Sequence, residues 1–507
     1  MRLRSQAKLG AALGFLIGIS AVLPAHATLI ATGSTSPGAA TLNAGSNPFT
    51  TTSQVFIAVG GAGTATLNGS ASGNGITTFN ANSASGSGVT VGLSGTGTFT
   101  VDGTGGAATL NSQRMIVVGG ASGNGTLTVQ NGGTAQTTTG SFAVQVGASN
   151  GTGALNVTGT GSAVSSLGRI QVGAFTGGSG TVIVSGGGTL QTTGTSATNT
   201  ELEVGQGSVT VTNANSELTV GGMLIGGTGT ASLTVSNGAT ATSNETATDF
   251  GGGLSVGGSA GATVTVTGSG SVLNVGAIGA GNFIAGNEIN IGGFDTGTLI
   301  VDNSGELDAN GANINVSGGV FHTSTSATGL LTVKGGGTVT ANNVTVWANG
   351  TLNGAGGTID ADVTINGGTL APGNSPGTMT ITGDLDLTDG FLDLEIDPLG
   401  LSDLIMVEGD LIIGEDFLFN LYFLNPPAGG STFNILSFFD VFGSVEIDPL
   451  FDISKSYTVT GASPTAINVT LEVTDDGTDV PEPATIALFG VGLAGFAAMR
   501  RRRQAKA

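Results

Sequence analysis

The sequence contains no cysteine, one tryptophan and only 12 lysine and arginine residues among its 507. Without cysteine, the chain has no disulfide bonds, thiolate zinc sites or cysteine nucleophiles. Only four basic residues lie between residues 28 and 480, and because binding to phosphates needs clustered cations, nucleic acid is excluded as a partner. Charged residues make up 9% of the chain, against about a quarter in a typical domain, which argues against an ordinary α/β enzyme.

Glycine is in large excess, and the acidic residues are unevenly distributed. The chain has 93 glycines and a formal net charge of -21. One acidic residue, Asp102, lies within residues 28–200, whereas 21 lie within residues 358–480, a region that also holds many of the phenylalanines. This change in composition predicts a boundary near residue 358.

The N-terminal residues have the layout of a secretory signal. Three basic residues precede an apolar run at residues 9–23, and the small residues Ala25 and Ala27 follow. This order is typical of a signal peptide with its cleavage site, so we predict a signal peptide at residues 1–27 and a mature protein that begins at Thr28. The apolar run is shorter than the roughly 20 residues of a stable membrane span, which disfavours an N-terminal anchor.

Residues 479–507 form a tail with three parts in a fixed order. A proline-containing motif comes first, an apolar segment of sixteen uncharged residues (484–499) second, and an arginine cluster last. The motif is Val480, Pro481, Glu482 and Pro483, and the cluster is Arg500, Arg501, Arg502 and Arg503. This order resembles a PEP-CTERM sorting signal of Gram-negative bacteria. The resemblance implies an exported protein that meets the secretion machinery and then an exosortase, an integral-membrane enzyme that cuts near the Pro-Glu-Pro motif.

The tail also predicts a topology. As a helix, residues 484–499 would be about 24 Å long, a little shorter than the roughly 30 Å hydrocarbon core of a bilayer. The arginine cluster would stay cytoplasmic by the positive-inside rule, so residues before Val480 would lie outside the inner membrane. We expect a protein anchored by this transmembrane helix before processing and located at the cell surface or outside the cell afterwards. A plain, uncleaved anchor helix is the alternative, with the same topology.

Between the two ends, one pattern is repeated many times. It begins with an apolar pair, two residues apart and followed in most cases by glycine: Ile57/Val59, Val89/Val91, Ile116/Val118, Val144/Val146, Ile170/Val172, Leu202/Val204, Met223/Ile225, Leu254/Val256 and Ile289/Ile291. A second pattern, G-T-L-T-V or a variant, follows some ten residues later, with Val101, Val129 and Val157 at equal intervals. A third, weaker segment contains single apolar residues such as Leu190 and Leu218. Each repeat therefore predicts three short strands.

The alternation of residue types predicts how the strands pack. Because alternate residues of a strand face one side, the apolar residues face inward and the intervening Thr, Ser or Asn outward. Stacked coil on coil, such strands form a right-handed parallel β-helix, with glycine supplying the positive-φ corners. Ten or more coils would make a rod about 50 to 60 Å long. A β-propeller, whose blades need four strands, and a disordered chain, which the regular alternation opposes, are the alternatives.

Residues 28–357 thus form the predicted repetitive β-helix, and residues 358–478 its acidic, Phe-rich end. We expect final coils and a bulkier β cap there, because the end of a solenoid must be covered against edge-to-edge pairing. Residues 366–388 resemble the autotransporter-associated repeat of passenger domains, and the coils before them resemble passenger β-helices. This resemblance implies a passenger-like β-helix.

Few residues are candidates for catalysis. Some sugar-cleaving enzymes use a β-helix, and glycoside hydrolysis needs two carboxylates across one cleft. The acidic groups that come into question are Glu201/Glu203, Asp302/Glu306/Asp308 and Asp360/Asp362, and the single histidine of the mature region is His322. No basic residue lies near Glu201 and Glu203 in the sequence, and His322 has no obvious acidic partner. We therefore favour solvated acidic faces and assign no catalytic residue.

Two binding functions are alternatives to a purely structural role. Asp384 and Asp386 share the outer face of a strand, and because calcium prefers oxygen ligands they are weak calcium candidates. The calcium-binding nonapeptide repeat has aspartate in its glycine turns, which these repeats lack, so no metal or cofactor is predicted. Outward threonine pairs such as Thr126/Thr128 resemble the ice-binding faces of some β-solenoids. The array is interrupted at Ala154/Asn156, Thr181/Ile183 and Thr298/Ile300.

The sequence as a whole predicts an all-β fold, a right-handed parallel β-helix with a C-terminal β cap, between an N-terminal signal helix and a C-terminal transmembrane helix. It predicts an exported, non-enzymatic protein of the cell surface or extracellular matrix, structural or adhesive in type, with extracellular polysaccharide as a possible partner. The alternatives are a polysaccharide-active enzyme, either a lyase or a glycoside hydrolase, and an ice-binding solenoid.

Overall fold

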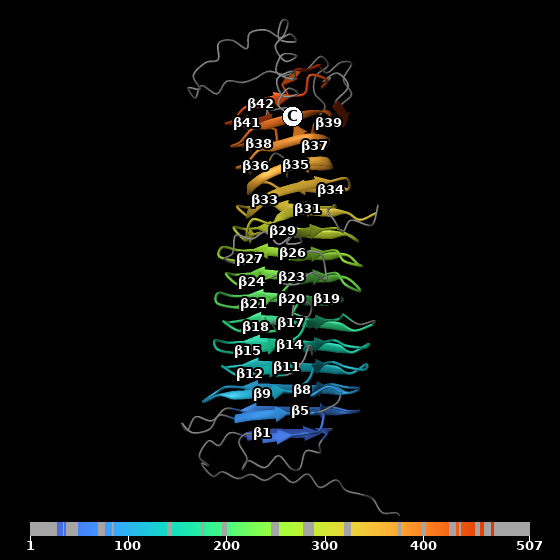
Figure 1. Ribbon diagram of the computed structural model, residues 1–507, viewed down its shortest axis with the longest axis vertical. Helices are drawn as coiled ribbons and strands as arrows, with labels where there is room; N and C mark the ends of the chain where they lie inside the picture. The colour runs from blue at the N-terminus through green and yellow to red at the C-terminus, as the bar shows by residue number, and fades with distance from the viewer. Residues whose placement is uncertain are drawn as a thin grey trace, which may run out of the picture.

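The computed structural model forms one long stack of short strands (Figure 1). It describes residues 28–33, 35–36, 49–68, 77–83, 86–138, 144–174, 177–194, 200–244, 253–276, 288–318, 326–373, 377–396, 402–424, 432–434, 438–451, 457–460 and 468–470. Within these ranges the secondary structure is β-strand, with no α-helix. No helix in the described part of the chain is long and apolar enough to cross a membrane. The predicted signal peptide (1–27) and the predicted helix (484–499) lie outside the described residues.

Three ladders of parallel strands run along the stack, and each coil adds one strand to each ladder. The first ladder contains β4 (Val55–Ile57), β7 (Val89–Val91), β10 (Ile116–Val118), β13 (Val144–Val146), β16 (Ile170–Val172), β19 (Leu202–Val204), β22 (Met223–Ile225), β25 (Leu254–Val256), β28 (Glu288–Ile291) and β31 (Asn313–Val316). The second contains β5 (Ala62–Asn68), β8 (Thr96–Asp102), β11 (Asn124–Gln130), β14 (Thr152–Thr158), β17 (Ser179–Ser185), β20 (Gly207–Thr212), β23 (Ala231–Ser236), β26 (Ala262–Thr267), β29 (Gly297–Asp302), β32 (Gly329–Val333) and β34 (Gly350–Asn353). The third contains β3 (Phe49–Thr51), β6 (Thr77–Ala81), β9 (Ala108–Ser112), β12 (Thr134–Thr137), β15 (Ala163–Ser166), β18 (Thr189–Thr192), β21 (Glu217–Val220), β24 (Thr240–Ser243), β27 (Val272–Val275) and β30 (Glu306–Asp308). The parallel β-helix predicted from the repeats is therefore confirmed, whereas its right-handed coiling stays a prediction.

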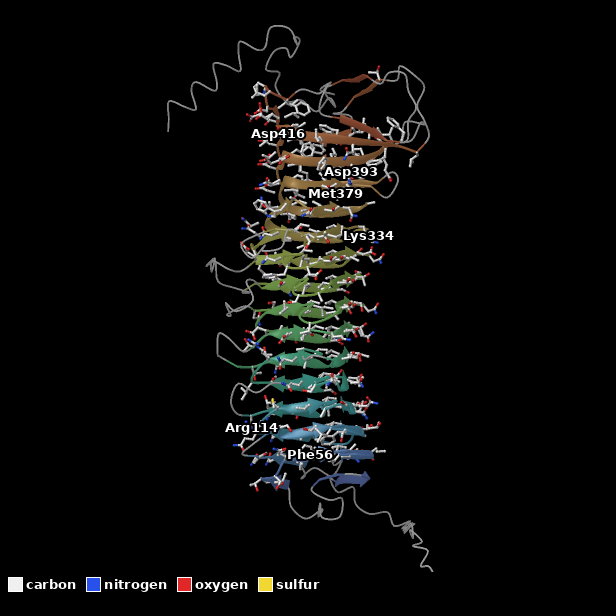
Figure 2. All side chains as sticks on the ribbon, turned by 90° about the vertical axis from the view of Figure 1, so that its right-hand side faces the viewer. Phe56, Arg114, Lys334, Met379, Asp393 and Asp416 are labelled. Carbon is white, nitrogen blue, oxygen red and sulfur yellow. The ribbon has the colours of Figure 1, made fainter. Side chains whose placement is uncertain are left out.

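The apolar residues of successive coils lie directly above one another in the core. Val101, Val129, Val157 and Val184 pair in register along the second ladder, and none of them is exposed. The residues between them, such as Thr128, point outward and are partly exposed. Figure 2 shows side chains filling the interior of the stack over its whole length, with short polar side chains along the rims. The core is thus one continuous column of aliphatic side chains.

One predicted apolar pair is wrong. In β4 the two inward residues are Val55 and Ile57, whereas Val59 is 39% exposed. The residue after Ile57 is Ala58, which adopts a positive φ of 67° where later coils have glycine. The predicted pair is therefore two residues too late, because the corner that ends this strand has alanine instead of the glycine that marks it in later coils.

Glycine is needed in the coils for two different reasons. Gly119, after the first-ladder strand β10, has a φ of 74°, in the left-handed region that glycine adopts without strain. Gly125, in β11, needs no such φ, but a Cβ there would collide with the carbonyl oxygen of Val91 in the coil before. The positive-φ corners were predicted from the sequence, whereas the close approach of the backbones was not.

Between about residues 330 and 390 the corners straighten and the coils are shorter, whereas the last coils are longer, with Leu411 paired with Val445. The strands β33 (Thr338–Trp347), β35 (Gly357–Ala371), β37 (Leu385–Ile396) and β39 (Leu411–Phe423) each serve more than one ladder, and β36 (Thr378–Ile381), β38 (Leu404–Val407), β41 (Phe439–Val441), β42 (Val445–Ile447) and β43 (Tyr457–Thr460) complete the coils. Stacked residues are 21 apart at Thr332 and Asn353, compared with 28 apart at Asp102 and Gln130. Ladder pairing continues through the predicted boundary at residue 358.

Aromatic side chains widen the core at this end. Phe417 and Phe419 are fully buried, with ring centroids 5.6 Å apart and nearly perpendicular planes, and Phe451 packs edge-on against Phe419. Edge-to-face packing is a favoured arrangement of aromatic rings. A separate two-stranded sheet of β40 (Thr432–Asn434) and β44 (Asn468–Thr470) accompanies the last coil.

The N-terminal end has a feature that the repeats do not predict. β1 (Thr28–Gly33) pairs antiparallel with β5, and β2 (Thr35–Ser36) pairs antiparallel with β4. The first coil is therefore covered at its edge by strands of opposite direction. Because unpaired strand edges promote association with other chains, this arrangement protects the N-terminal end of the stack.

The core register gives a direct test by substitution. We expect Val129→Asp to lower the free energy of unfolding by about 3 kcal/mol or more, because it places an unpaired carboxylate in the apolar column. The matched control Thr128→Asp, on the outer face of the same strand, should change it by less than about 1 kcal/mol. Urea denaturation followed by circular dichroism measures both values. Equal losses for the two variants would contradict the assignment of inner and outer faces.

Candidate functional site

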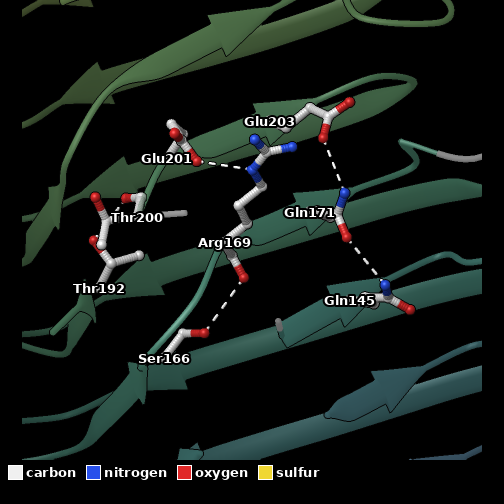
Figure 3. A network of polar contacts seen from close by, with 8 residues as sticks. All are labelled: Gln145, Ser166, Arg169, Gln171, Thr192, Thr200, Glu201 and Glu203. Atoms are coloured by element: carbon white, nitrogen blue, oxygen red, sulfur yellow. Dashed lines mark hydrogen bonds and ion pairs between the residues drawn. The ribbon is translucent and has the colours of Figure 1, made fainter. Parts of the chain in front are cut away.

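The predicted carboxylates Glu201 and Glu203 lie together on the outer side of the first ladder (Figure 3). They flank Leu202, which points into the core in β19. The coil before places Arg169 beside Glu201 and Gln171 beside Glu203. Arg169 Nε donates a hydrogen bond to Glu201 Oε2 at 2.8 Å, and Gln171 Nε2 donates to Glu203 Oε2 at 2.9 Å. A cation therefore stands next to this acidic pair.

Sequence reasoning missed Arg169 because it is 32 residues from Glu201 along the chain. A usable signal exists: both residues stand directly before the apolar pair of a first-ladder strand, in R-I-Q-V and E-L-E-V. The ladder also continues downward, since Gln145 Nε2 donates to Gln171 Oε1 at 3.0 Å. Gln145, Gln171 and Glu203 thus form one hydrogen-bonded column across three coils.

Glu201 is far less exposed than an outward carboxylate normally is. Its side chain is 2% exposed, whereas that of Arg169 is 26% exposed. Its second oxygen, Oε1, and the hydroxyl of Thr200 are buried and have no hydrogen-bond partner among the described residues. A buried polar atom without a partner costs on the order of 1–3 kcal/mol, so this corner of the network is its least stable part.

Asp384 and Asp386, the calcium candidates, are hydrogen-bonded within the protein. Asp384 Oδ1 accepts from the backbone N–H of Asp410 in the next coil at 2.8 Å, and Asp386 Oδ1 accepts from Thr388 Oγ1 at 2.6 Å. The same contact recurs below, where Asp362 Oδ1 accepts from the N–H of Asp384 at 3.0 Å. Asp362 and Asp384 therefore join successive coils, whereas the bond of Asp386 lies within its own strand. Within the described ranges, no group of three or more His, Asp or Glu residues is placed to hold a metal ion.

Most of the remaining predicted carboxylates accept hydrogen bonds within turns or between coils. Asp302 Oδ1 accepts from the N–H of Asn303 at 2.6 Å, and its other oxygen lies 3.9 Å from Lys334 Nζ. Asp308 Oδ1 accepts from the N–H of Asn310, and Asp360 Oδ1 from Thr382 Oγ1. Glu306, the candidate grouped with Asp302 and Asp308, is exposed at the start of β30.

Two aspartates that the sequence did not single out have shifted pKa values. Asp403 is fully buried, and burial raises the pKa of its carboxyl group although the N–H groups of Glu395 and Gly377 donate to it. Partial burial also acts to raise the pKa of Asp102, but hydrogen bonds from Thr104, Asn131 and Gln130 outweigh it and lower that pKa to about 2. Asp102 holds its own turn and bonds to the next coil, whereas Asp403 links the backbone of Gly377 with that of Glu395.

The outward threonines lie in register, as the repeats predict. Thr126 is aligned with Thr98 on one side and with Ala154 on the other, and Thr128 is aligned with Asn156. The next coil aligns Ile183 with Asn156, which interrupts the column again. The threonine columns are therefore discontinuous at the positions expected from the sequence.

The other predicted sites lie outside the described residues. These are His322, the signal cleavage residues Ala25 and Ala27, the sorting motif Val480, Pro481, Glu482 and Pro483, and the cluster Arg500, Arg501, Arg502 and Arg503.

Comparison with known proteins identifies the tail. Residues 479–503 match the family model described as the PEP-CTERM protein-sorting motif. No curated protein matches the chain. Among solved structures, the hyper-glycosylated fragment 55–350 of the autotransporter passenger TibA, modified by TibC, is similar with 18% identity and a TM-score of 0.35, over 75% of this chain and 97% of the fragment. The β-helix assignment rests on the strand pairing of this chain.

The Arg169–Glu201 ion pair allows a stability test. Arg169→Gln should lower the free energy of unfolding by about 3 kcal/mol, because it leaves a buried carboxylate without its cation. The matched control Lys334→Gln removes an exposed pair with Asp302 and should cost less than about 1 kcal/mol. Chemical denaturation measures both, and a loss for Arg169→Gln no larger than the control would contradict the ion pair.

Asp102 predicts a pH dependence of stability. Because its pKa is about 2 in the folded chain and near 3.8 otherwise, its ionised form stabilises the fold above about pH 4, and that stabilisation is lost as the pH falls toward 2. The difference in urea midpoint between the wild type and Asp102→Asn should therefore shrink from pH 5 to pH 2. Thr104→Ala, which removes one donor, should shift this loss to higher pH. A difference that stays constant over this range would contradict the low pKa.

Proposed function

We propose that this protein is an exported, non-enzymatic rod of the cell surface or extracellular matrix, sorted through its PEP-CTERM tail by an exosortase. The observation that carries the proposal is the sorting motif at residues 479–503, behind a body built almost wholly of stacked strands. A protein with this tail is expected to cross the inner membrane, to be held there before processing, and to reach the surface afterwards. The body would then act as a spacer or adhesive element.

The chemistry of the body supports a structural role. The acidic side chains weighed as catalytic or metal-binding groups mostly accept hydrogen bonds that hold corners or join coils, as Asp384 and Asp362 do. The outer faces carry mainly small, uncharged polar residues. Catalytic sites usually concentrate titratable groups in one cleft, and a long wall of threonine, serine and asparagine is better suited to contact than to acid–base chemistry.

The tail has the parts that processing would need. The prolines around Glu482 fix φ and favour an extended backbone, which a membrane enzyme can bind along its length. The arginine cluster, Arg500 to Arg503, would hold the apolar segment 484–499 in the membrane, since moving each arginine into the bilayer centre costs a few kcal/mol. We infer that the exosortase recognises the extended motif by binding it, while the arginines stop translocation of the chain.

A polysaccharide-active enzyme is the second candidate, and one contact favours it. Arg169 lies beside the Glu201/Glu203 pair, which supplies a cation next to two carboxylates. If the pair were catalytic, the purified protein would release reducing or unsaturated ends from a polysaccharide, and Glu203→Gln would abolish the release. Under the structural proposal, no polysaccharide is cleaved by either protein.

The sorting proposal predicts the fate of a tail variant. Pro481→Ala combined with Glu482→Ala should leave the protein exported but uncleaved in the inner membrane, because the extended recognition segment is lost. Neutral residues in place of Arg500 to Arg503 should instead weaken retention before processing. Cell fractionation together with mass spectrometry of the C-terminus distinguishes these outcomes. An intact Ala507 in the surface-located wild-type protein would refute processing and favour a plain anchor.

A further inference from the structure

The only tryptophan of the chain interrupts the repeat at a defined position. In most coils, the residue after the first-ladder strand is a glycine at the corner, for example Gly257 after β25 and Gly292 after β28. In β33, Val346 is aligned with Val316, the last residue of β31, and the next residue is Trp347. Trp347 therefore stands where most coils have the corner glycine. The neighbouring strand β35 has a bulge there, since its residues Asn366 and Gly367 are both aligned with Trp347. A bulge often redirects a side chain at a functional position.

The neighbouring coil makes room for the indole ring. Gly318 lies against it, and a Cβ at Gly318 would collide with the Cδ1, Cγ and Cβ atoms of Trp347. The indole Nε1 donates a hydrogen bond to Asn315 Oδ1 at 3.2 Å, so the ring is fixed above β31. Trp347 is only partly buried and is not part of the aliphatic core. A large, partly exposed aromatic ring is thus held in a fixed position at the corner of the rod.

Asn315 connects the ring to a carboxylate. Its Nδ2 donates to Glu288 Oε2 at 3.0 Å and to Asn290 Oδ1 at 3.2 Å. Asn290 and Asn315 are nearly fully buried, whereas Glu288 is partly exposed. Because Glu288 is partly exposed, its carboxylate can accept a further hydrogen bond from a ligand. The amides position the ring and the carboxylate relative to each other.

A second aromatic side chain lies at the same corner. Phe294 follows β28 and is 39% exposed. It belongs to the coil of β28, and Trp347 belongs to the coil two steps further along the stack. With adjacent strands about 4.8 Å apart, the two residues are about 10 Å apart along the rod axis. Among the described residues of the coil between them, the small residues Ser317 and Gly318 stand at this corner.

We propose that Trp347, Phe294 and Glu288 form a binding strip for an uncharged glycan chain. The C–H groups on one face of a sugar ring carry partial positive charge and fit the negative face of an aromatic ring, while the hydroxyl groups donate to a carboxylate. Two aromatic residues spaced along a straight edge suit an extended ligand, whereas binding of a quaternary ammonium group needs several rings around one point. The acidic chain, with a net charge of -21, would repel an anionic glycan. This inference rests on the proposed surface location and names the ligand class.

Because Trp347 is the only tryptophan, its fluorescence reports on this strip alone. Purified full-length protein is titrated with cellohexaose, laminarihexaose and maltohexaose, with a hexagalacturonate and choline as comparisons, and calorimetry is run in parallel. We expect a saturable change of emission with at least one neutral hexasaccharide and none with the other two compounds. Trp347→Phe, measured by calorimetry, and Phe294→Ser, measured by both methods, should weaken binding roughly five- to tenfold.

The matched control is Phe391→Ser, which removes a similarly exposed phenylalanine (38%) on β37, and it should bind like the wild type. Circular dichroism and melting of each variant show whether it is folded, and Phe294→Ser removes an exposed side chain that the core does not need. Wild-type binding by both Trp347→Phe and Phe294→Ser, no response to any neutral hexasaccharide, or equal binding of hexagalacturonate or choline would overturn the proposal. The sorting experiment does not involve these residues, so either proposal can fail without the other.

Discussion

The close contact between the backbones of successive coils is the constraint on which this structure depends. At the corner after the first ladder, Gly119 donates its N–H to the carbonyl of Val91 at 2.8 Å, and one coil later Gly147 donates to that of Val118 at 2.7 Å. This hydrogen bond recurs at nearly every coil, and at Gly119 and Gly147 a Cβ would collide with the backbone of the following coil. The glycine content of the chain follows from it. So does the exact alignment of the aliphatic residues that fill the core.

The same stacking limits the charge on the outer walls. Equivalent residues of adjacent coils are about 4.8 Å apart, so a charged residue repeated in register would face a like charge at every step. Threonine, serine, asparagine and glutamine avoid this repulsion and can bond along the rod, as Gln145 and Gln171 do. Where aspartates are stacked, at residues 362, 384 and 410, each carboxylate accepts the backbone N–H of the next coil. In this column a backbone donor offsets the negative charge of each aspartate.

Most of the fold could be predicted from the sequence because a solenoid makes its long-range contacts at one repeat length. Once Val129 and Val157 are recognised as equivalent, their contact follows. What could not be predicted depends on exact register or on the ends of the stack. To predict the Arg169–Glu201 pair, two coils of different length would have to be aligned correctly. The strand β1 could not be predicted from the repeat, because it pairs antiparallel and the repeated strands pair parallel. The hydrogen bonds of Asp384 were missed for the same reason: its partner is in another coil.

In a molecule of this kind, function is expected where the repeat is broken. A coil that follows the pattern satisfies its own hydrogen bonds and core contacts, so any departure must be stabilised separately. Trp347 replaces a corner glycine, and its place is secured by the missing side chain of Gly318 and by the hydrogen bond to Asn315. These three residues come from two coils, and a substitution in any one of them alone would remove support from the others. Such a coordinated departure is better explained by a contact outside the rod than by the stability of the rod, because the glycine corners of the neighbouring coils stack without it.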